Sequence, residues 1–125
     1  MCNIIISIKP KYVEEIFSGN KRYEYRKCKC KENIDKIIIY STFPVKKIVG
    51  EAKVEEILED SPEKIWKITE NESGINYKFY NEYYENRKKA VAYKLTDIKK
   101  YDIPRELSYY GLKIPPQSYR YITQN

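Results

Sequence analysis

The sequence of 125 residues contains no histidine and three cysteines. Without histidine, no side chain has an unperturbed pKa near neutrality, so acid–base catalysis would depend on a shifted lysine, glutamate or tyrosine. The missing imidazoles also leave Cys28 and Cys30 with too few partners for a zinc site, so we expect no metal. The odd number of cysteines predicts reduced thiols rather than a disulfide framework.

Long apolar runs are missing as well. No apolar segment approaches the roughly 18 residues of a membrane span. The opening MCNIIISIKPK lacks the basic start and long apolar segment of a signal peptide, so we expect a cytoplasmic protein without membrane attachment. Phosphate-binding loops and dinucleotide glycine patterns are absent too, and we expect no cofactor.

What is present is charge and enough apolar surface for a core. Hydrophobic residues make up 42% of the chain, which predicts one domain over residues 1–125. The formal net charge of +6 favours a phosphate-bearing partner. Abundant Lys, Ile, Asn, Tyr and Glu are typical of an A+T-rich genome, so the placement of the five arginines is more informative. Two of them, Arg22 and Arg26, lie in GNKRYEYRK (residues 19–27).

Hydrophobic periodicity divides the chain into short alternating elements. Strands are predicted over residues 3–8, 21–27, 35–41, 46–58 and 89–97, with a last strand within 115–123. Helices are predicted over residues 10–18, 61–69 and 74–87. Residues 28–34 are expected to form a charged loop, and residues 103–107 one helical turn. The order predicts an α+β fold, a small and partly open mixed β-barrel flanked by short helices.

Individual residues support these boundaries. Gly19 is expected to end the first helix and Gly50 to mark a bulge. In the third helix, Ile75, Phe79 and Tyr83 are spaced four residues apart, which predicts a face packed on the core.

Three segments of the chain carry a resemblance to a known family. They are IIISIKPKYVEEIFSGNKRYEYRK (4–27), YENRKKAVAYKL (84–95) and IPPQSYRYI (114–122). In this order they resemble the ASCH domain, a relative of the PUA fold. The resemblance implies a PUA-like pseudo-barrel whose cleft, partly lined by the Gly-x-Lys segment, binds RNA, nucleotides or modified bases.

The resemblance also implies two possible activities. Some small members remove an acetyl group from N4-acetylcytidine with a lysine and a threonine on the strand after the glycine. Lys21 matches that lysine, but Glu24 stands at the threonine position, so the hydroxyl nucleophile is missing. Other members have been assigned ribonuclease activity. If the chain is an enzyme, Lys21 and Glu24 are the candidate catalytic residues.

Strand alternation assigns the charged side chains of residues 21–27 to two faces. Arg22, Glu24 and Arg26 share one face, with neighbours roughly 6 to 7 Å apart. Lys21 and Lys27 share the other face with two tyrosines that we expect in the core. Glu24 is then placed to accept from a base amino group, and Arg26 to hold a phosphate or carbonyl. The alternative is an exposed strand whose ion pairs contribute ~0 to 1 kcal/mol.

Other candidate ligand-binding residues end neighbouring strands. Lys9 follows the first strand, where a lysine at the mouth of the cleft and a solvated helix-start lysine are both possible. Tyr40 and Ser41 end the third strand, where they form either a core edge or a stacking platform with a hydroxyl donor. The ligand-binding set is therefore Lys9, Lys21, Glu24, Arg26, Lys27, Tyr40 and Ser41.

The function expected from the sequence is binding of RNA or of a modified nucleobase or nucleotide, with DNA as a possible partner. The alternatives are a small hydrolase acting on the same ligands, either an N4-acetylcytidine amidohydrolase or a ribonuclease, and a protein-interaction module. The sequence leaves the oligomeric state open.

Overall fold

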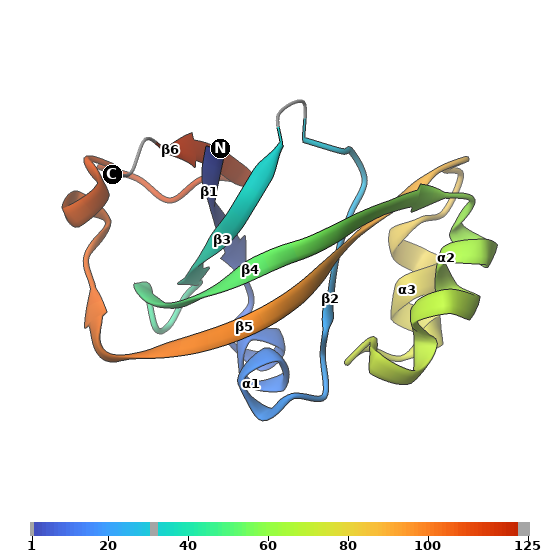
Figure 1. Ribbon diagram of the computed structural model, residues 1–125, viewed down its shortest axis with the longest axis horizontal. Helices are drawn as coiled ribbons and strands as arrows, with labels where there is room; N and C mark the ends of the chain where they lie inside the picture. Colours follow the sequence, from blue (N-terminus) through green and yellow to red (C-terminus); the bar gives the residue numbers. More distant parts are fainter. Residues whose placement is uncertain (1, 31–32, 123–125) are drawn as a thin grey trace.

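The computed structural model describes residues 2–30 and 33–122. A curled six-stranded sheet is flanked by three short helices (Figure 1). In chain order the elements are β1 (Cys2–Ile8), α1 (Pro10–Ser18), β2 (Tyr23–Arg26), β3 (Ile34–Ser41), β4 (Lys47–Asp60), α2 (Pro62–Thr69), the 3₁₀ helix η1 (Glu70–Glu72), α3 (Tyr77–Tyr83), β5 (Ala90–Arg105), the 3₁₀ helix η2 (Leu107–Tyr110) and β6 (Tyr119–Ile122).

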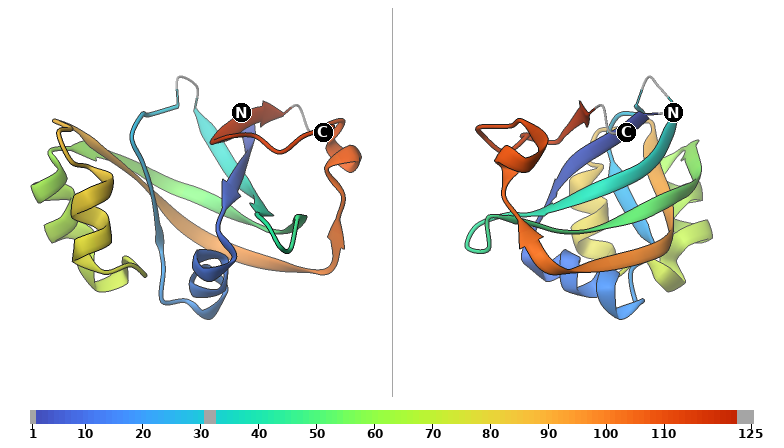
Figure 2. Two further views of the ribbon diagram at one scale, coloured as in Figure 1. Left: turned by 180° about the vertical axis from the view of Figure 1, so that it is seen from behind. Right: turned by 60° about the vertical axis from the view of Figure 1, so that its left-hand side comes forward.

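The sheet is mixed, in the strand order β2-β5-β4-β3-β1-β6. β1 and β3 run parallel, and every other neighbouring pair is antiparallel. Strong twist brings the two ends of the sheet toward each other, as the two views of Figure 2 show. β2 and β6 form those ends and do not pair with each other, so the barrel stays open. The predicted α+β pseudo-barrel is confirmed.

Three apolar clusters hold the fold together. The first fills the inside of the curled sheet, where isoleucines of β1 and β3 meet Val13 and Ile16 of α1. The second lies between the β2–β5 ribbon and the pair α2 and α3, which stand side by side at one end of the sheet (Figure 1). The third covers the outer face of β1 and β3 with Leu112 and the η2 segment. Covering both faces explains why β1 and β3 are almost continuously apolar.

Helix boundaries follow the expected signals. Pro10 occupies the first turn of α1, and Gly19 ends the helix with a left-handed φ of 89°. Ser61 caps α2 by accepting a hydrogen bond from the backbone N–H of Lys64 at 3.3 Å. The predicted helices over residues 10–18 and 61–69, and the helix end at Gly19, are confirmed.

Gly50 lies where β3, β4 and β5 lose their regular register. The β4–β5 pairing shifts between Ile48 and Gly50, as expected for a bulge. A Cβ at Gly50 would lie 2.4 Å from the carbonyl oxygen of Lys99 and 2.7 Å from the Phe17 ring. Only glycine therefore lets α1 pack this closely on the sheet.

Two predictions about local structure were wrong. Residues 103–105 continue β5 instead of forming a helical turn, and the turn comes later as η2. α3 is shorter than the predicted helix, and its core face carries Tyr80 with Tyr84 just beyond the helix. Of the residues predicted to face the core, Ile75 and Tyr83 are partly buried and pack against the cluster of Tyr80 and Tyr84, whereas Phe79 does not belong to that cluster.

Some predicted features extend outside the described residues. These are part of the loop 28–34 and the end of the last strand at residue 123. Among the helices that the structure describes, none has both the length and the apolar character needed to cross a bilayer.

Candidate functional site

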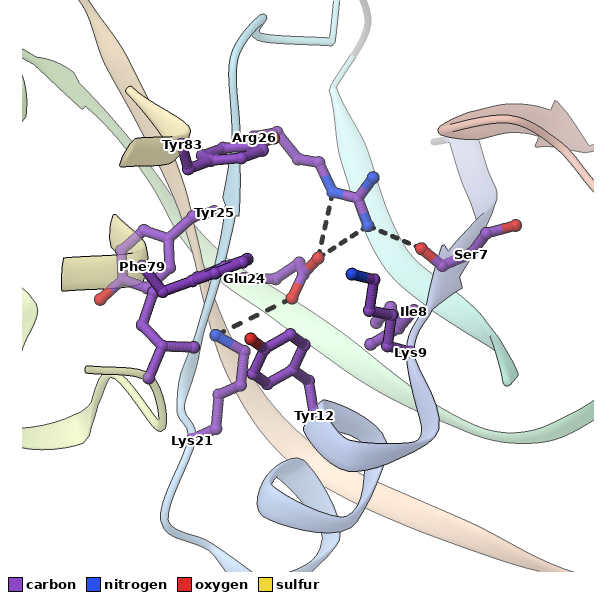
Figure 3. Close-up of a pocket in the computed structure, with 11 residues that line it drawn as sticks. Ser7, Ile8, Lys9, Tyr12, Lys21, Glu24, Tyr25, Arg26, Phe79 and Tyr83 are labelled. Atoms are coloured by element: carbon purple, nitrogen blue, oxygen red, sulfur yellow. Dashed lines mark hydrogen bonds and ion pairs between the residues drawn. The ribbon is translucent and has the colours of Figure 1, made fainter. Parts of the chain in front are cut away.

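A pocket of about 170 Å³ opens between the end of β1, α1, β2 and α3 (Figure 3). It brings together polar side chains from β2 and from the start of α1 with rings from α1 and α3. Its lining consists of Ser7, Ile8, Lys9, Tyr12, Lys21, Glu24, Tyr25, Arg26, Ile75, Phe79 and Tyr83.

Glu24 and Arg26 form the polar centre of the pocket. They point from β2 in the same direction because they are two residues apart on a strand. The Arg26 guanidinium donates to one carboxylate oxygen of Glu24, Oε2, from Nε at 3.0 Å and from Nη2 at 2.7 Å. The Glu24 side chain is 9% exposed, so the alternative of a solvent-exposed strand with idle ion pairs is wrong for this pair.

Arg26 also joins the two ends of the open sheet. Its Nη2 donates to the backbone carbonyl of Ser7 on β1 at 2.9 Å, and its Nη1 donates to Ser118 Oγ at 3.1 Å, just before β6. The guanidinium is therefore held by three protein acceptors on separate segments. It is a fixed part of the pocket wall that orients Glu24.

Lys21 lies at the base of the pocket and is 2% exposed. Its ammonium donates to the carbonyl of Ser73 at 2.9 Å and lies 4.0 Å from Glu24 Oε1. The ring centroid of Tyr25 is 4.7 Å from Nζ, within cation–π range. Burial lowers the pKa of Lys21 from 10.5 to about 8; the charge of Glu24 opposes this shift, and that of Arg26 adds to it.

The segment between η1 and α3 forms a cradle for Lys21. Ser73 pairs with Lys21 in an isolated β-bridge, which positions the accepting carbonyl. Gly74 has a left-handed φ of 66°, and a Cβ there would lie 2.4 Å from the Cβ of Lys21 and 2.8 Å from its Cγ. The glycine thus permits the close approach that places the ammonium beside Glu24.

Three aromatic side chains, Tyr12, Phe79 and Tyr83, line the pocket and are called the aromatic wall below (Figure 3). The ring centroids of Tyr12 and Phe79 are 5.5 Å apart, and those of Phe79 and Tyr83 are 6.4 Å apart and nearly parallel. Burial, followed by the charge of Glu24, raises the pKa of Tyr12, so its hydroxyl stays protonated and able to donate at neutral pH.

Two polar groups remain open to a ligand. Glu24 Oε1 lies within ion-pair distance of Lys21, yet no donor among the described residues reaches it at hydrogen-bond distance. The exposed Lys9 side chain reaches into the same space, and Figure 3 shows its ammonium beside the Glu24–Arg26 pair. The pocket therefore presents an acceptor and a cationic donor beside aromatic rings.

The structure brings Lys9, Lys21, Glu24 and Arg26 together, as the sequence predicted for these four candidates. The prediction that Lys21 faces away from Glu24 was wrong, because β2 begins at Tyr23 and Lys21 precedes the alternating strand. Arg22 does not pair with Glu24 either; its Nε lies 3.2 Å from Glu72 Oε2.

The other three candidates lie elsewhere. Lys27 is outside the pocket lining, with its Nζ 4.9 Å from the Tyr83 ring centroid. Tyr40 and Ser41 are 3% and 2% exposed, and neither lines the pocket. The η2 segment covers the face of β3 that carries Tyr40, so the tyrosine belongs to the core and cannot offer a ring face to a base there.

Sequence reasoning did not identify the aromatic wall. Tyr12 lies within the helix predicted over residues 10–18, and the spacing of Phe79 and Tyr83 predicts a face packed on the core. One available signal was the number of aromatic residues on helix 74–87, which is larger than one buried face needs: Tyr80 and Tyr84 are buried in the core, and Phe79 and Tyr83 line the pocket.

Comparison with known proteins identifies the family. The model of the ASCH domain matches residues 6–99, and the chain therefore belongs to the ASCH domain family. The crystal structure of ASCH from Zymomonas mobilis superposes with a TM-score of 0.88 at 28% identity, covering 98% of this chain and 88% of that one. A crystal structure of a tyrosine-to-phenylalanine mutant of the same protein gives the same TM-score.

Relatives of known name place the domain in different settings. A Zymomonas mobilis protein named ASCH domain-containing ribonuclease is 32% identical over 94 residues, 74% of this chain and 64% of that protein. The large ribosomal subunit protein uL22 of Ureaplasma parvum is 31% identical over 120 residues, 95% of this chain. The chain spans 39% of the length of that uL22 protein.

Proposed function

We propose that this ASCH domain binds single-stranded RNA by holding one nucleobase in the pocket between the aromatic wall and Glu24. The observation that carries the proposal is an open carboxylate oxygen beside three aromatic rings at one small pocket. A volume of about 170 Å³ is below the roughly 300–1,000 Å³ of pockets for drug-sized ligands, which suits a single base. Stacking on aromatic side chains contributes about 1–3 kcal/mol per base.

The open groups favour a base that carries an exocyclic amino group. Glu24 Oε1 accepts a hydrogen bond but cannot donate one, so it pairs with an amino group such as N4 of cytosine. A uracil in the same position would turn the O4 carbonyl toward the carboxylate. The ammonium of Lys9 supplies a donor for a ring carbonyl or for the phosphate. A modified cytosine that keeps an N–H at this position would fit the same contacts.

The Zymomonas mobilis relative, whose name is that of a ribonuclease, supports RNA as the polymer. Unpaired RNA bases are accessible for stacking and for edge recognition, whereas those in a duplex are not. The pocket admits a base only from a single strand, loop or end.

Titration of five-nucleotide RNAs of uniform sequence by fluorescence anisotropy tests this proposal. Phe79→Leu removes a ring of the aromatic wall and keeps an apolar side chain, and it is expected to weaken binding roughly 5- to 100-fold. Phe43→Leu is the matched control, because Phe43 is 79% exposed and does not line the pocket. Equal effects of the two substitutions, or no binding by the wild type, would overturn the proposal.

RNA cleavage is a second candidate function. The observation that favours it is Lys21, whose pKa of about 8 leaves part of the amine neutral near physiological pH, 4.0 Å from a carboxylate. A 5′-labelled oligonucleotide incubated with the wild type and with Lys21→Met tests it. Methionine fills a similar volume without the amine, so cleavage by the wild type alone would support hydrolysis. Cleavage by both variants would exclude Lys21 as its source.

A further inference from the structure

Four basic side chains gather beyond the rim of the pocket, where β2 ends and β5 begins. Lys27 directly follows β2, and Arg87, Lys88 and Lys89 directly precede β5; we call these four residues the basic rim. Arg26 pairs with Val91 in the antiparallel β2–β5 ribbon, so both segments leave the ribbon at the same end. The Tyr84 hydroxyl donates to the backbone carbonyl of Arg26 at 2.8 Å, which ties the two segments together.

These side chains are exposed. Of the residues that the structure describes, none with a carboxylate lies within 4.0 Å of a basic-rim nitrogen. Some lysines on the sheet are paired, among them Lys36 with Glu51 and Lys94 with Glu55, each at 3.0 Å. The loop before β5 contains one acidic residue, Glu85, beside three basic ones. Arg87 also lines a second pocket that contains Glu63, Glu82 and Glu85, so the local excess of positive charge lies mainly on Lys27, Lys88 and Lys89.

Tyr83 connects the basic rim to the pocket. Its ring belongs to the aromatic wall, and Lys27 Nζ lies 4.9 Å from the ring centroid. Burial raises the pKa of Tyr83, and the charges of Arg26 and Arg87 act against that rise. A chain leaving the pocket past Tyr83 therefore meets the basic rim first.

We propose that the basic rim binds the phosphates of nucleotides adjacent to the base in the pocket, and so sets the side on which the RNA strand leaves. This inference rests on the proposed function. Exposed cations without carboxylate partners can neutralise backbone phosphates without first breaking an ion pair. The pocket then selects the base, and the basic rim provides affinity that grows with RNA length and falls with salt.

Arg87, Lys88 and Lys89 also follow the carboxyl end of α3 in the chain, and positive charge close to the carboxyl end of a helix stabilises it. That contribution is to folding and would appear in the melting temperature. Phosphate binding appears in RNA affinity and its salt dependence, so the two roles are separable.

The test compares a double variant Lys88→Gln, Lys89→Gln with a control double variant Lys99→Gln, Lys100→Gln. The control lysines are exposed on β5, the strand that Lys88 and Lys89 precede, and they lie outside the pocket lining and the basic rim. Each protein is titrated with cytidine monophosphate and with a five-nucleotide RNA between 50 and 200 mM salt. We expect the basic-rim variant to bind the five-nucleotide RNA about fivefold more weakly, as for two exposed ion pairs. Its salt slope should fall by about 1.4, and its mononucleotide affinity should stay unchanged.

Three results would overturn the inference. Equal losses in both double variants would show a general charge effect. If wild-type affinity does not grow from the mononucleotide to the five-nucleotide RNA, the basic rim does not bind phosphates, and the proposed base-binding role of the pocket is unaffected. If the wild type binds neither ligand, both the proposed function and the proposed role of the basic rim are overturned.

Discussion

Arg26 donates two hydrogen bonds to a single oxygen of Glu24, at 3.0 and 2.7 Å, and leaves the other oxygen facing the pocket. The same guanidinium binds Ser7 and Ser118 on the opposite end of the sheet. One arginine therefore both orients the candidate ligand acceptor and joins the open edges of the pseudo-barrel. This arrangement predicts that the pair matters for stability as well as for binding.

A double-mutant cycle of Glu24→Gln and Arg26→Gln checks that prediction. Each single substitution is expected to lower the free energy of unfolding by about 1.5–3 kcal/mol, the value of hydrogen bonds to a charged group. Because the residues share two hydrogen bonds, the coupling energy should be about 0.5–3 kcal/mol. Urea unfolding of the four proteins gives these values. A coupling energy of zero would show that the hydrogen bonds between these two side chains add nothing to the stability of the fold.

The pKa of Lys21 reports the electrostatics of the pocket. A titration followed by the ¹³Cε signal of Lys21 should give a midpoint of about 8, against 10.5 for an ordinary lysine. Glu24→Gln should lower this pKa further, because the carboxylate raises it, whereas Arg26→Gln should raise it. Shifts in the same direction for both variants would contradict the assignment.

The lowered pKa of Lys21 also determines how this residue makes the free energy of unfolding depend on pH. Because the folded pKa is lowered, the unfolded chain binds a proton between pH 8 and 10.5 that the folded chain has released. Stability from this group therefore rises with pH across that window and is constant below it. Subtracting the profile of Lys21→Met isolates this contribution from that of the buried tyrosines. A difference that falls over the window would contradict the account.

Gly74→Ala tests the cradle. The new Cβ would lie 2.4 Å from the Cβ of Lys21, in addition to the strain of a positive φ. Gly111→Ala is a matched control, since Gly111 also has a positive φ, 76°, but no atom of the residues that the structure describes lies within 4 Å of its added Cβ.

We expect Gly74→Ala to lower the free energy of unfolding by about 1–3 kcal/mol more than the control does, which is the usual cost of overpacking. It should also move the pKa of Lys21, which the control should leave in place. Identical melting temperatures and identical Lys21 titrations for the two variants would show that the cradle has no role in positioning the amine.

Local signals predicted much of the fold. Apolar runs identified the central strands, and the ranges of α1 and α2 were predictable because their boundary residues, such as Gly19 and Ser61, act on neighbours in sequence. The length of β5 was not predictable locally. Its second half, which includes Ile103 at 79% exposure, is held mainly by pairing with β4 and lacks a continuous apolar pattern.

The position of a site residue was predictable where strand alternation determines it. It was not predictable where contacts between distant segments determine it. Glu24 and Arg26 lie two apart on a strand, so their pairing followed from spacing. Lys21 turns toward them because of Ser73 and Gly74, which are more than 50 residues away in the chain. Tyr40 lies in the core and is not available to a ligand, because η2 covers it. This contact joins segments that are distant in sequence.

The central claim is that Glu24 reads the amino group of a base beside the aromatic wall. The direct measurement is the ratio of affinities for five-nucleotide cytidine and uridine RNAs, in the wild type and in Glu24→Gln. Comparing a ratio cancels the effect of the lost charge on phosphates, since both RNAs carry the same backbone. We expect a wild-type preference for cytidine of about tenfold, as one base contact provides, and a ratio near one for Glu24→Gln, whose amide can accept or donate. Equal affinities in the wild type, or an unchanged ratio in the variant, would contradict the account.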